Sequence, residues 1–131
     1  MKSLHYLLVF LLLCLFSSCE IIREVAQDQL QDNLSCIPPT SSTYNQSLRF
    51  VQEKRFEHDR ENTANRETKH LKCMTSNQIR GFVDLLDFEH ARLEYAKFAY
   101  AFCSDPNRYY STISPTLDFD SSKQDLEELT R

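Results

Sequence analysis

Residues 87–100, D-F-E-H-A-R-L-E-Y-A-K-F-A-Y, decide the fold class of this 131-residue chain. Apolar side chains recur in and just after this stretch at the three- and four-residue spacing of an α-helix. One stripe holds Phe88, Ala91, Tyr95, Phe98, Ala99 and Phe102, and a second holds Leu93, Ala96 and Tyr100. A helix that is apolar on two sides is buried on two sides. We therefore predict a central helix over residues 88–102 in an all-α fold.

The motif that opens this stretch occurs three times. F-E-H-D-R begins at Phe56, F-E-H-A-R at Phe88 and F-D-S-S-K at Phe119, at intervals of about 32 residues that are typical of helical repeats. Each unit is interpreted as a helix, a turn and a second helix that ends at D-F. Such units cannot bury their apolar faces alone and must stack. Residues 47–131 are thus predicted to form a small domain of tandem helix-turn-helix repeats.

Capping residues predict where the helices begin. Ser47 is expected to cap a first short helix, and Thr75 opens T-S-N-Q, a capping box. Asp87 is expected to cap the central helix, and Asp105 to open another with a proline at its first position. The last helix is predicted over residues 121–129, with Leu126 and Leu129 facing the core.

The first helix of the first unit, residues 58–71, is mostly polar. Only Ala64 and Leu71 are expected to reach a core, and Arg66 stands where the second unit has Phe98. Terminal repeats carry polar outer faces. We therefore predict an exposed outer helix here.

The N-terminus predicts export and lipidation. Lys2 precedes an unbroken apolar run over residues 7–16, and Ser17 and Ser18 lead into Cys19. This order is that of a secretory signal peptide. L-F-S-S-C also resembles the bacterial lipobox, which predicts cleavage after residue 18 and a lipid, palmitate included, on Cys19. The alternative is an ordinary signal peptide with Cys19 incidental.

Residues 19–46 are interpreted as a tether. Residues 21–34 have the apolar spacing of one short amphipathic helix. Pro38 and Pro39 would end it, and the Ser/Thr run after them is linker composition.

Composition excludes several classes of function. The net charge of −4 comes with no basic patch, which disfavours nucleic acid. The single glycine leaves no phosphate-binding loop. Cys36, Cys73 and Cys103 follow Cys19, and because three is odd, at least one of them stays unpaired or pairs with another molecule. Cys73 and Cys103 are expected to be buried small residues, too far apart for a mutual disulfide.

Four motifs carry a resemblance to a known family. They are T-S-N-Q at 75–78, D-F-E-H-A-R-L-E-Y-A-K-F-A-Y at 87–100, D-P-N-R-Y-Y at 105–110 and D-F-D-S-S-K-Q-D-L at 118–126. In this order they resemble a domain of unknown function found in lipoproteins and secreted proteins of Bacteroidota. The resemblance covers roughly residues 47–131 and implies a fold and a location, not a reaction. The polar helix at 58–71 departs from the family pattern, which is more apolar there.

No side-chain constellation predicts chemistry. His58 and His90 occupy the same repeat position, but neighbouring units would hold them roughly 8–10 Å apart, so a shared metal is not expected. Tyr109 and Tyr110 are expected in the core, and Asp105 is expected to be a helix cap rather than a catalytic acid. We predict no catalytic, cofactor-binding or metal-binding residue, and Cys19 as the one modified residue.

These patterns favour a lipid-tethered protein-interaction module of the bacterial cell envelope, on the outer rather than the inner membrane. Its protein partner is not identified by the sequence. Two alternatives stay open: an enzyme whose site is assembled from dispersed residues, and a secreted helical protein without lipid.

Overall fold

The computed structural model describes residues 36–131, which contain six α-helices and three short 3₁₀ helices. No strand occurs in these residues, only an isolated bridge between Met74 and Cys103. The all-α prediction is therefore confirmed for this part of the chain. The predicted signal peptide, Cys19 and the predicted helix at 21–34 lie outside the described residues. The helices are α2 (Ser41–Gln52), α3 (Glu57–Leu71), α4 (Ser76–Val83), α5 (Glu89–Ala99), η1 (Tyr100–Phe102), η2 (Pro106–Arg108), α6 (Tyr109–Ile113), η3 (Ser114–Thr116) and α7 (Asp120–Thr130).

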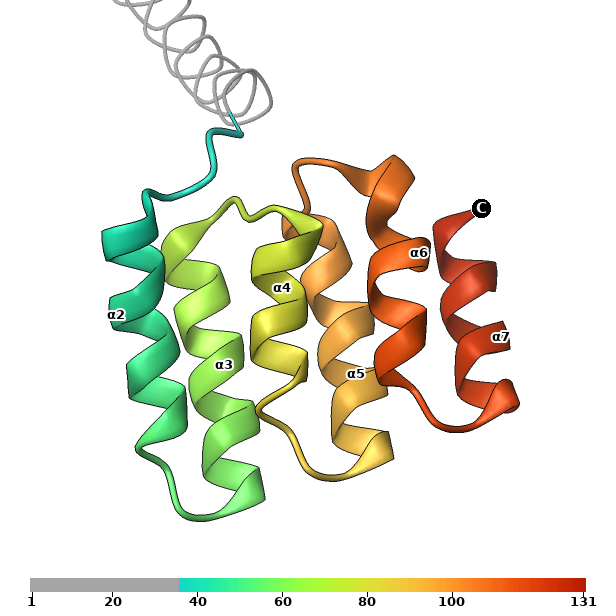
Figure 1. Cartoon of the computed structure of the whole chain (residues 1–131), viewed down its shortest axis with the longest axis horizontal. Coiled ribbons are helices and arrows are strands. Elements are labelled where there is room, and N and C mark those ends of the chain that lie inside the picture. The colour runs from blue at the N-terminus through green and yellow to red at the C-terminus, as the bar shows by residue number, and fades with distance from the viewer. Residues whose placement is uncertain (1–35) are drawn as a thin grey trace, which may run out of the picture. The chain divides into compact units, whose positions relative to one another are not determined.

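The α-helices form two layers (Figure 1). Helices α3, α5 and α7 are neighbours in one layer, and α2, α4 and α6 are neighbours in the other. Successive α-helices run in opposite directions, so α3, α5 and α7 all begin at the same end of the domain, the lower end in Figure 1. The repeat seen in the sequence is thus a repeat of structure, because each of these three helices follows the phenylalanine of one motif.

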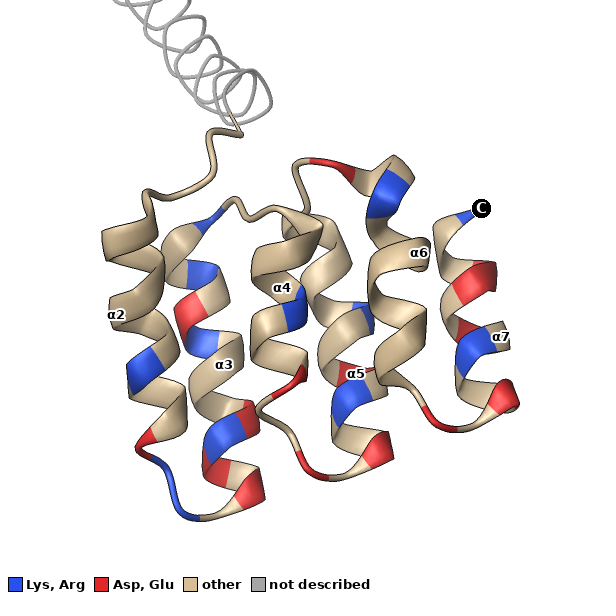
Figure 2. Ribbon diagram, viewed as in Figure 1, with Lys and Arg blue, Asp and Glu red and all other residues tan. Residues whose placement is uncertain are grey.

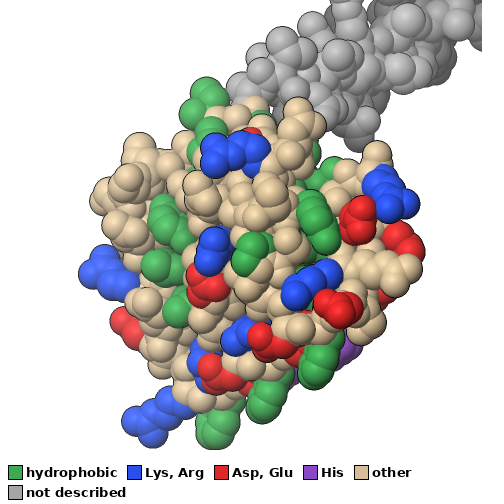
Figure 3. All heavy atoms as spheres, turned by 45° about the vertical axis from the view of Figure 1, so that its right-hand side comes forward, with side chains coloured by type: hydrophobic (Ala, Val, Ile, Leu, Met, Phe, Trp, Pro, Cys, Tyr) green, Lys and Arg blue, Asp and Glu red, His purple; other side chains and the backbone are tan. Residues whose placement is uncertain are grey.

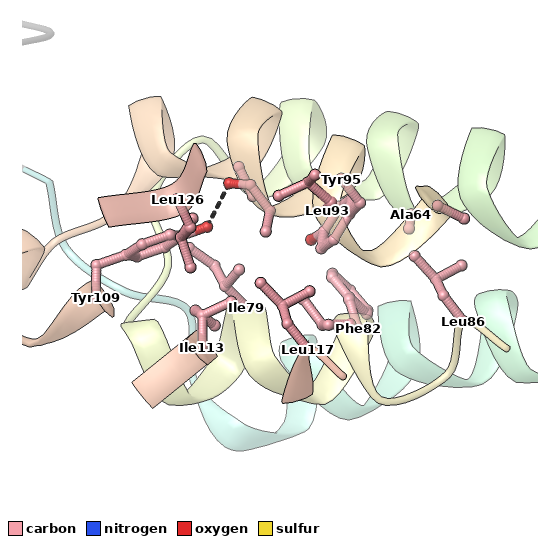
Figure 4. Close-up of a cluster of buried hydrophobic side chains, with 14 of the residues drawn as sticks. Ala64, Ile79, Phe82, Leu86, Leu93, Tyr95, Tyr109, Ile113, Leu117 and Leu126 are labelled. Carbon is pink, nitrogen blue, oxygen red and sulfur yellow. Dashed lines mark hydrogen bonds between the residues drawn. The ribbon is translucent and has the colours of Figure 1, made fainter. Parts of the chain in front are cut away.

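The core lies between the two layers (Figure 4). Helix α5 buries Leu93 and Ala96 from one predicted stripe and Ala91, Tyr95 and Ala99 from the other, which confirms its burial on two sides. The largest fully buried side chains come from both layers and from the segments that join them: Tyr95, Tyr109, Phe82, Met74, Ile79, Leu86, Ile113, Leu126, Val51 and Val83.

The ends of the first stripe of α5 are not in the core. Phe88 is the N-cap residue, with extended backbone at φ −94° and ψ 134°, so it precedes the helix and does not follow its periodicity. Phe98 is only partly buried; its ring contacts the ring of Phe102, and the Lys69 ammonium lies 5.6 Å from its centre. Phe98 belongs to the predicted apolar stripe but lies at the edge of the core, whereas Tyr95 of the same stripe is fully buried.

The prediction that residues 58–71 form an exposed outer helix is also wrong. Helix α3 lies between α2 and α5, and it buries Thr63, Ala64, Glu67 and Thr68. Its polar groups meet polar partners on both sides. Ser47 of α2 donates a 2.9 Å hydrogen bond to the Glu67 carboxylate, and the Thr68 and Tyr95 hydroxyls are 2.8 Å apart. Glu67 and Thr68 can therefore be buried here because they make hydrogen bonds inside the protein, whereas Asn65 Oδ1 of the same helix is buried without a partner.

The start of α2 differs from the sequence prediction, whereas the start of α4 agrees with it. Helix α2 begins at Ser41, and its cap is Thr40, whose hydroxyl accepts from the Thr43 amide. The predicted cap Ser47 is instead buried in the middle of this helix. Thr75 forms the predicted capping box with Gln78, which is confirmed.

At the other end of the chain, α7 buries Leu126, whereas Leu129, also predicted to face the core, is 42% exposed. Leu129 lies three residues beyond Leu126, close to the C-terminal end of α7.

A disulfide joins Cys36 to Cys73, with Cα atoms 5.2 Å apart. It ties the first described residue to the segment that follows α3, so Cys73 is buried as predicted and is also paired. Among the described residues Cys103 keeps a free thiol, in line with the odd count. Within residues 36–131 no helix has the length and apolar character needed to cross a bilayer.

Candidate interaction surface

Three exposed phenylalanines occupy the same position in the three repeats. Phe56, Phe88 and Phe119 are the N-cap residues of α3, α5 and α7, and they are 71%, 65% and 61% exposed. Since these helices are successive neighbours in one layer, the three side chains follow one another along one end of the domain. We call them the phenylalanine row. Figure 3 shows hydrophobic side chains along the lower edge of the molecule, among charged ones.

A glutamate from each preceding repeat fixes the backbone of the next phenylalanine. The Glu57 carboxylate accepts from the amides of Asp87 and Phe88, at 2.8 and 3.1 Å. One repeat later, Glu89 accepts from the amides of Asp118 and Phe119, at 3.0–3.1 Å. These amides sit at helix N-termini, where four backbone donors lack partners within the helix. The cap therefore comes from the neighbouring repeat. Asp87, predicted to be the cap of its own helix, makes no capping hydrogen bond.

The motif arginines hold the same turns. Arg60 donates to the Leu85 carbonyl at 3.1 Å and to the Asp87 carboxylate at 2.6 Å. Arg92 donates to the Leu86 carbonyl at 2.7 Å and to the Thr116 carbonyl at 3.1 Å. The F-E-x-x-R motif is thus a device that joins consecutive repeats.

Electrostatics favour the ionised form of the second glutamate. Burial raises the pKa of Glu89, but hydrogen bonds from the amides of Asp118 and Phe119, from Ser122, and the charge of Arg92 outweigh it, so the pKa lies below its ordinary value. An ionised acceptor makes stronger hydrogen bonds than a neutral one. The turn that carries Phe119 is therefore held firmly at neutral pH.

The fixed turns do not require phenylalanine at the exposed position. The apolar contact of the turns with the core is made by Leu86 and Leu117, which are fully or almost fully buried just before each D-F pair. A polar residue at the phenylalanine position would cost nothing in the core. Exposed apolar side chains that cluster on one surface mark interaction sites, so the phenylalanine row is our candidate site.

Charge differs along the row. The residue just before each phenylalanine is Arg55, then Asp87, then Asp118, and all three are exposed. Lys54 adds a second cation at the first turn, and Asp120 adds an exposed carboxylate at the third. In Figure 2 acidic segments accordingly border the turns before α5 and α7, and a basic segment precedes α3. Exposed Glu53 and Asp59 balance Lys54 and Arg55 at the first turn, so the row runs from balanced charge near Phe56 to acidic charge near Phe119.

The histidines, tyrosines and Asp105 that the sequence offers as candidates for chemistry are either exposed or bonded within the fold. His58 and His90 are exposed. The described residues contain no group of three His, Cys, Asp or Glu side chains placed to hold a metal ion. Tyr109 is buried, as predicted, and its hydroxyl donates to the Ala96 carbonyl at 2.6 Å, the dashed line of Figure 4. Tyr110 is half-buried against the core.

Asp105 is a cap, as predicted, but of a different helix. Its carboxylate accepts from the Ser76 amide at 2.6 Å and from the Ser76 hydroxyl at 3.0 Å, so it caps α4 in the preceding repeat. The Cys103 thiol also donates to it, at 3.3 Å. Burial raises the pKa of this thiol to about 11, which keeps it protonated and weakly nucleophilic.

The sequence shows the three motifs but not the surface they form. The spacing of Phe88 from Ala91 and Tyr95 fits a helical stripe, which predicted Phe88 in the core. A leucine two residues before the phenylalanine, Leu86 in the second repeat and Leu117 in the third, already supplies the buried apolar side chain of the turn. This leucine is the signal that could have shown that Phe88 lies outside the core. Cys19, the predicted lipidation site, lies outside the described residues.

Comparison with known proteins yields one match. The model of one protein family, described as a domain of unknown function (DUF4476), matches residues 38–130, which include all three repeats. No curated protein and no solved structure matches the chain.

Proposed function

The chain belongs to the DUF4476 family, a domain of unknown function, and on this premise we propose that it is a lipid-tethered module that binds another protein at the bacterial cell envelope through its phenylalanine row. The tether would be the lipid on Cys19 and the residues that follow it. The folded domain would then bind its partner close to the membrane surface.

The observation that carries the proposal is the place of the row within the domain. The chain enters at Cys36, which the disulfide holds next to the C-terminal end of α3. Phe56 precedes the opposite end of the same helix. Fifteen residues at 1.5 Å each separate the two ends by about 22 Å. A tether that enters at Cys36 would leave the row at the far end, available to a partner that approaches from outside.

The size of the row suits the centre of a protein interface. A phenylalanine buries roughly 150–250 Å², so three that are about two-thirds exposed offer on the order of 300–500 Å². A stable interface covers about 800 Å² on each partner. The row alone is smaller, and the charged residues beside it would supply the polar rim that such interfaces have.

Site-specific photo-crosslinking in cells tests the proposal on the full chain. A benzoylphenylalanine replaces Phe88 in one strain and Ile37, an equally exposed apolar residue beside the disulfide, in the control strain. We expect a discrete protein adduct from position 88 alone, and its loss when Phe119→Ser is added in the same chain. Equal adducts from both positions, no protein adduct, or an adduct that survives Phe119→Ser would overturn the proposal.

A further inference from the structure

The spacing of the phenylalanine row selects the kind of element that can lie across it. Packed neighbouring helices stand about 8–10 Å apart, and each phenylalanine begins one helix of the layer formed by α3, α5 and α7. The side chains therefore recur at about that interval. On a β-strand, side chains of one face recur at about 6.6 Å and then 13 Å. Neither distance matches the interval between neighbouring phenylalanines. On an α-helix, residues seven apart lie on one face at about 10.5 Å, which matches it.

Resting on the proposed function, we infer that the partner presents an amphipathic α-helix that lies across the phenylalanine row, with apolar side chains at heptad spacing. To reach from Phe56 to Phe119 the helix must cover two intervals of about 10 Å. This requires at least about 15 residues at 1.5 Å each. Helix-in-groove recognition by such apolar anchors is a recurrent mode of protein binding.

The charge along the row determines the direction of the helix. Near the first phenylalanine exposed Glu53 and Asp59 balance Lys54 and Arg55, whereas exposed Asp118 and Asp120 flank the last phenylalanine. The partner helix should therefore carry basic residues where it passes Phe119 and none where it passes Phe56. Complementary charges across an interface fix register and exclude wrong partners.

Two designed peptides test this inference with the full chain in phosphatidylcholine nanodiscs, and empty nanodiscs serve as the baseline. The first peptide has 21 residues, with leucines at the first and fourth heptad positions, glutamates at one end and lysines at the other. The second has the same composition and the same charged ends, but its leucines alternate as in a strand. Binding is measured by fluorescence anisotropy of a label on the peptide.

We expect the heptad peptide to bind at least about tenfold more tightly than the alternating one. Phe88→Ser and, separately, Phe119→Ser should each weaken its binding about tenfold, as expected for the loss of one largely buried phenylalanine. Ile37→Ser, the matched control at the other end of the domain, should not change it. Two row variants are used so that circular dichroism can confirm at least one as folded. A benzophenone on the glutamate end should crosslink to residues 53–57, and one on the lysine end to residues 117–121.

Equal binding of the two peptides, tighter binding of the alternating one, no binding of either, or crosslinks in the reverse order would overturn the inference. None of these results removes the proposed function, which depends on the crosslinks formed in cells. Conversely, absence of adducts from position 88 in cells would remove the proposed function whatever the peptides do.

Discussion

Glu89→Ala tests whether the motif glutamates hold the repeats together. The variant removes an acceptor that receives hydrogen bonds from two amides at the start of α7, those of Asp118 and Phe119. Loss of a helix cap costs about 0.5–2 kcal/mol. Both amides lie at exposed positions, where water can replace the carboxylate, so we expect a loss of about 1–2 kcal/mol in the free energy of unfolding.

The matched control is Glu94→Ala on the same helix. It makes the same change in helix propensity, but its carboxylate is exposed and pairs only with Lys97, at 3.2 Å. Such a surface pair contributes about 0–0.5 kcal/mol. Thermal melts of residues 36–131, which form one compact unit, should separate the two variants. A difference of 1 kcal/mol corresponds to about 4–8 °C in a domain of this size.

The effect of Glu89→Ala should also depend on pH. The folded-state pKa of Glu89 is lowered, because hydrogen bonds from the two amides and from Ser122 outweigh the effect of burial. Its contribution to stability is therefore complete above the pKa of an unfolded glutamate, about 4.3, and is lost as the pH falls through the lower folded value. The gap between wild type and variant should be full at pH 7 and should close in acid. Equal destabilisation by Glu89→Ala and Glu94→Ala, or a gap that widens below pH 4.3, would refute the reasoning.

Three further outcomes are expected. A fatty-acid analogue should label the wild type in cells but not Cys19→Ala, and equal labelling would contradict lipidation. Replacing Cys36 and Cys73 by serine should lower the free energy of unfolding by about 4 kcal/mol, from the loop-entropy relation for a separation of 37 residues, and should lower the denaturant midpoint. An unchanged midpoint would show that the disulfide does not stabilise the domain by restricting the unfolded chain. Tyr95→Phe should cost about 1–2 kcal/mol, because it leaves the buried Thr68 hydroxyl without its partner; equal chemical-denaturation curves would show that this hydrogen bond contributes nothing.

The sequence by itself determined the fold class and the repeat. Helical periodicity, the capping box at Thr75 and the recurrence of F-E-x-x-R are local patterns, and local patterns report the secondary structure that a segment forms when its apolar face is buried. They located the starts of α3, α4, α5 and α7 to within one or two residues. They also identified Tyr109 as a core residue and Asp105 as a cap.

Only the tertiary structure decided which polar residues are inside and which apolar residues are outside. Glu67 and Thr68 looked solvated because the sequence does not show that α2 and α5 bring Ser47 and Tyr95 to them. Phe88 looked buried because its spacing fits a helical stripe, whereas the Glu57 carboxylate of the preceding repeat fixes it in the turn before the helix. In each case the deciding partner lies 20 or more residues away in the chain. The phenylalanine row exists for the same reason, since stacking of repeats brings together three side chains that the sequence keeps apart.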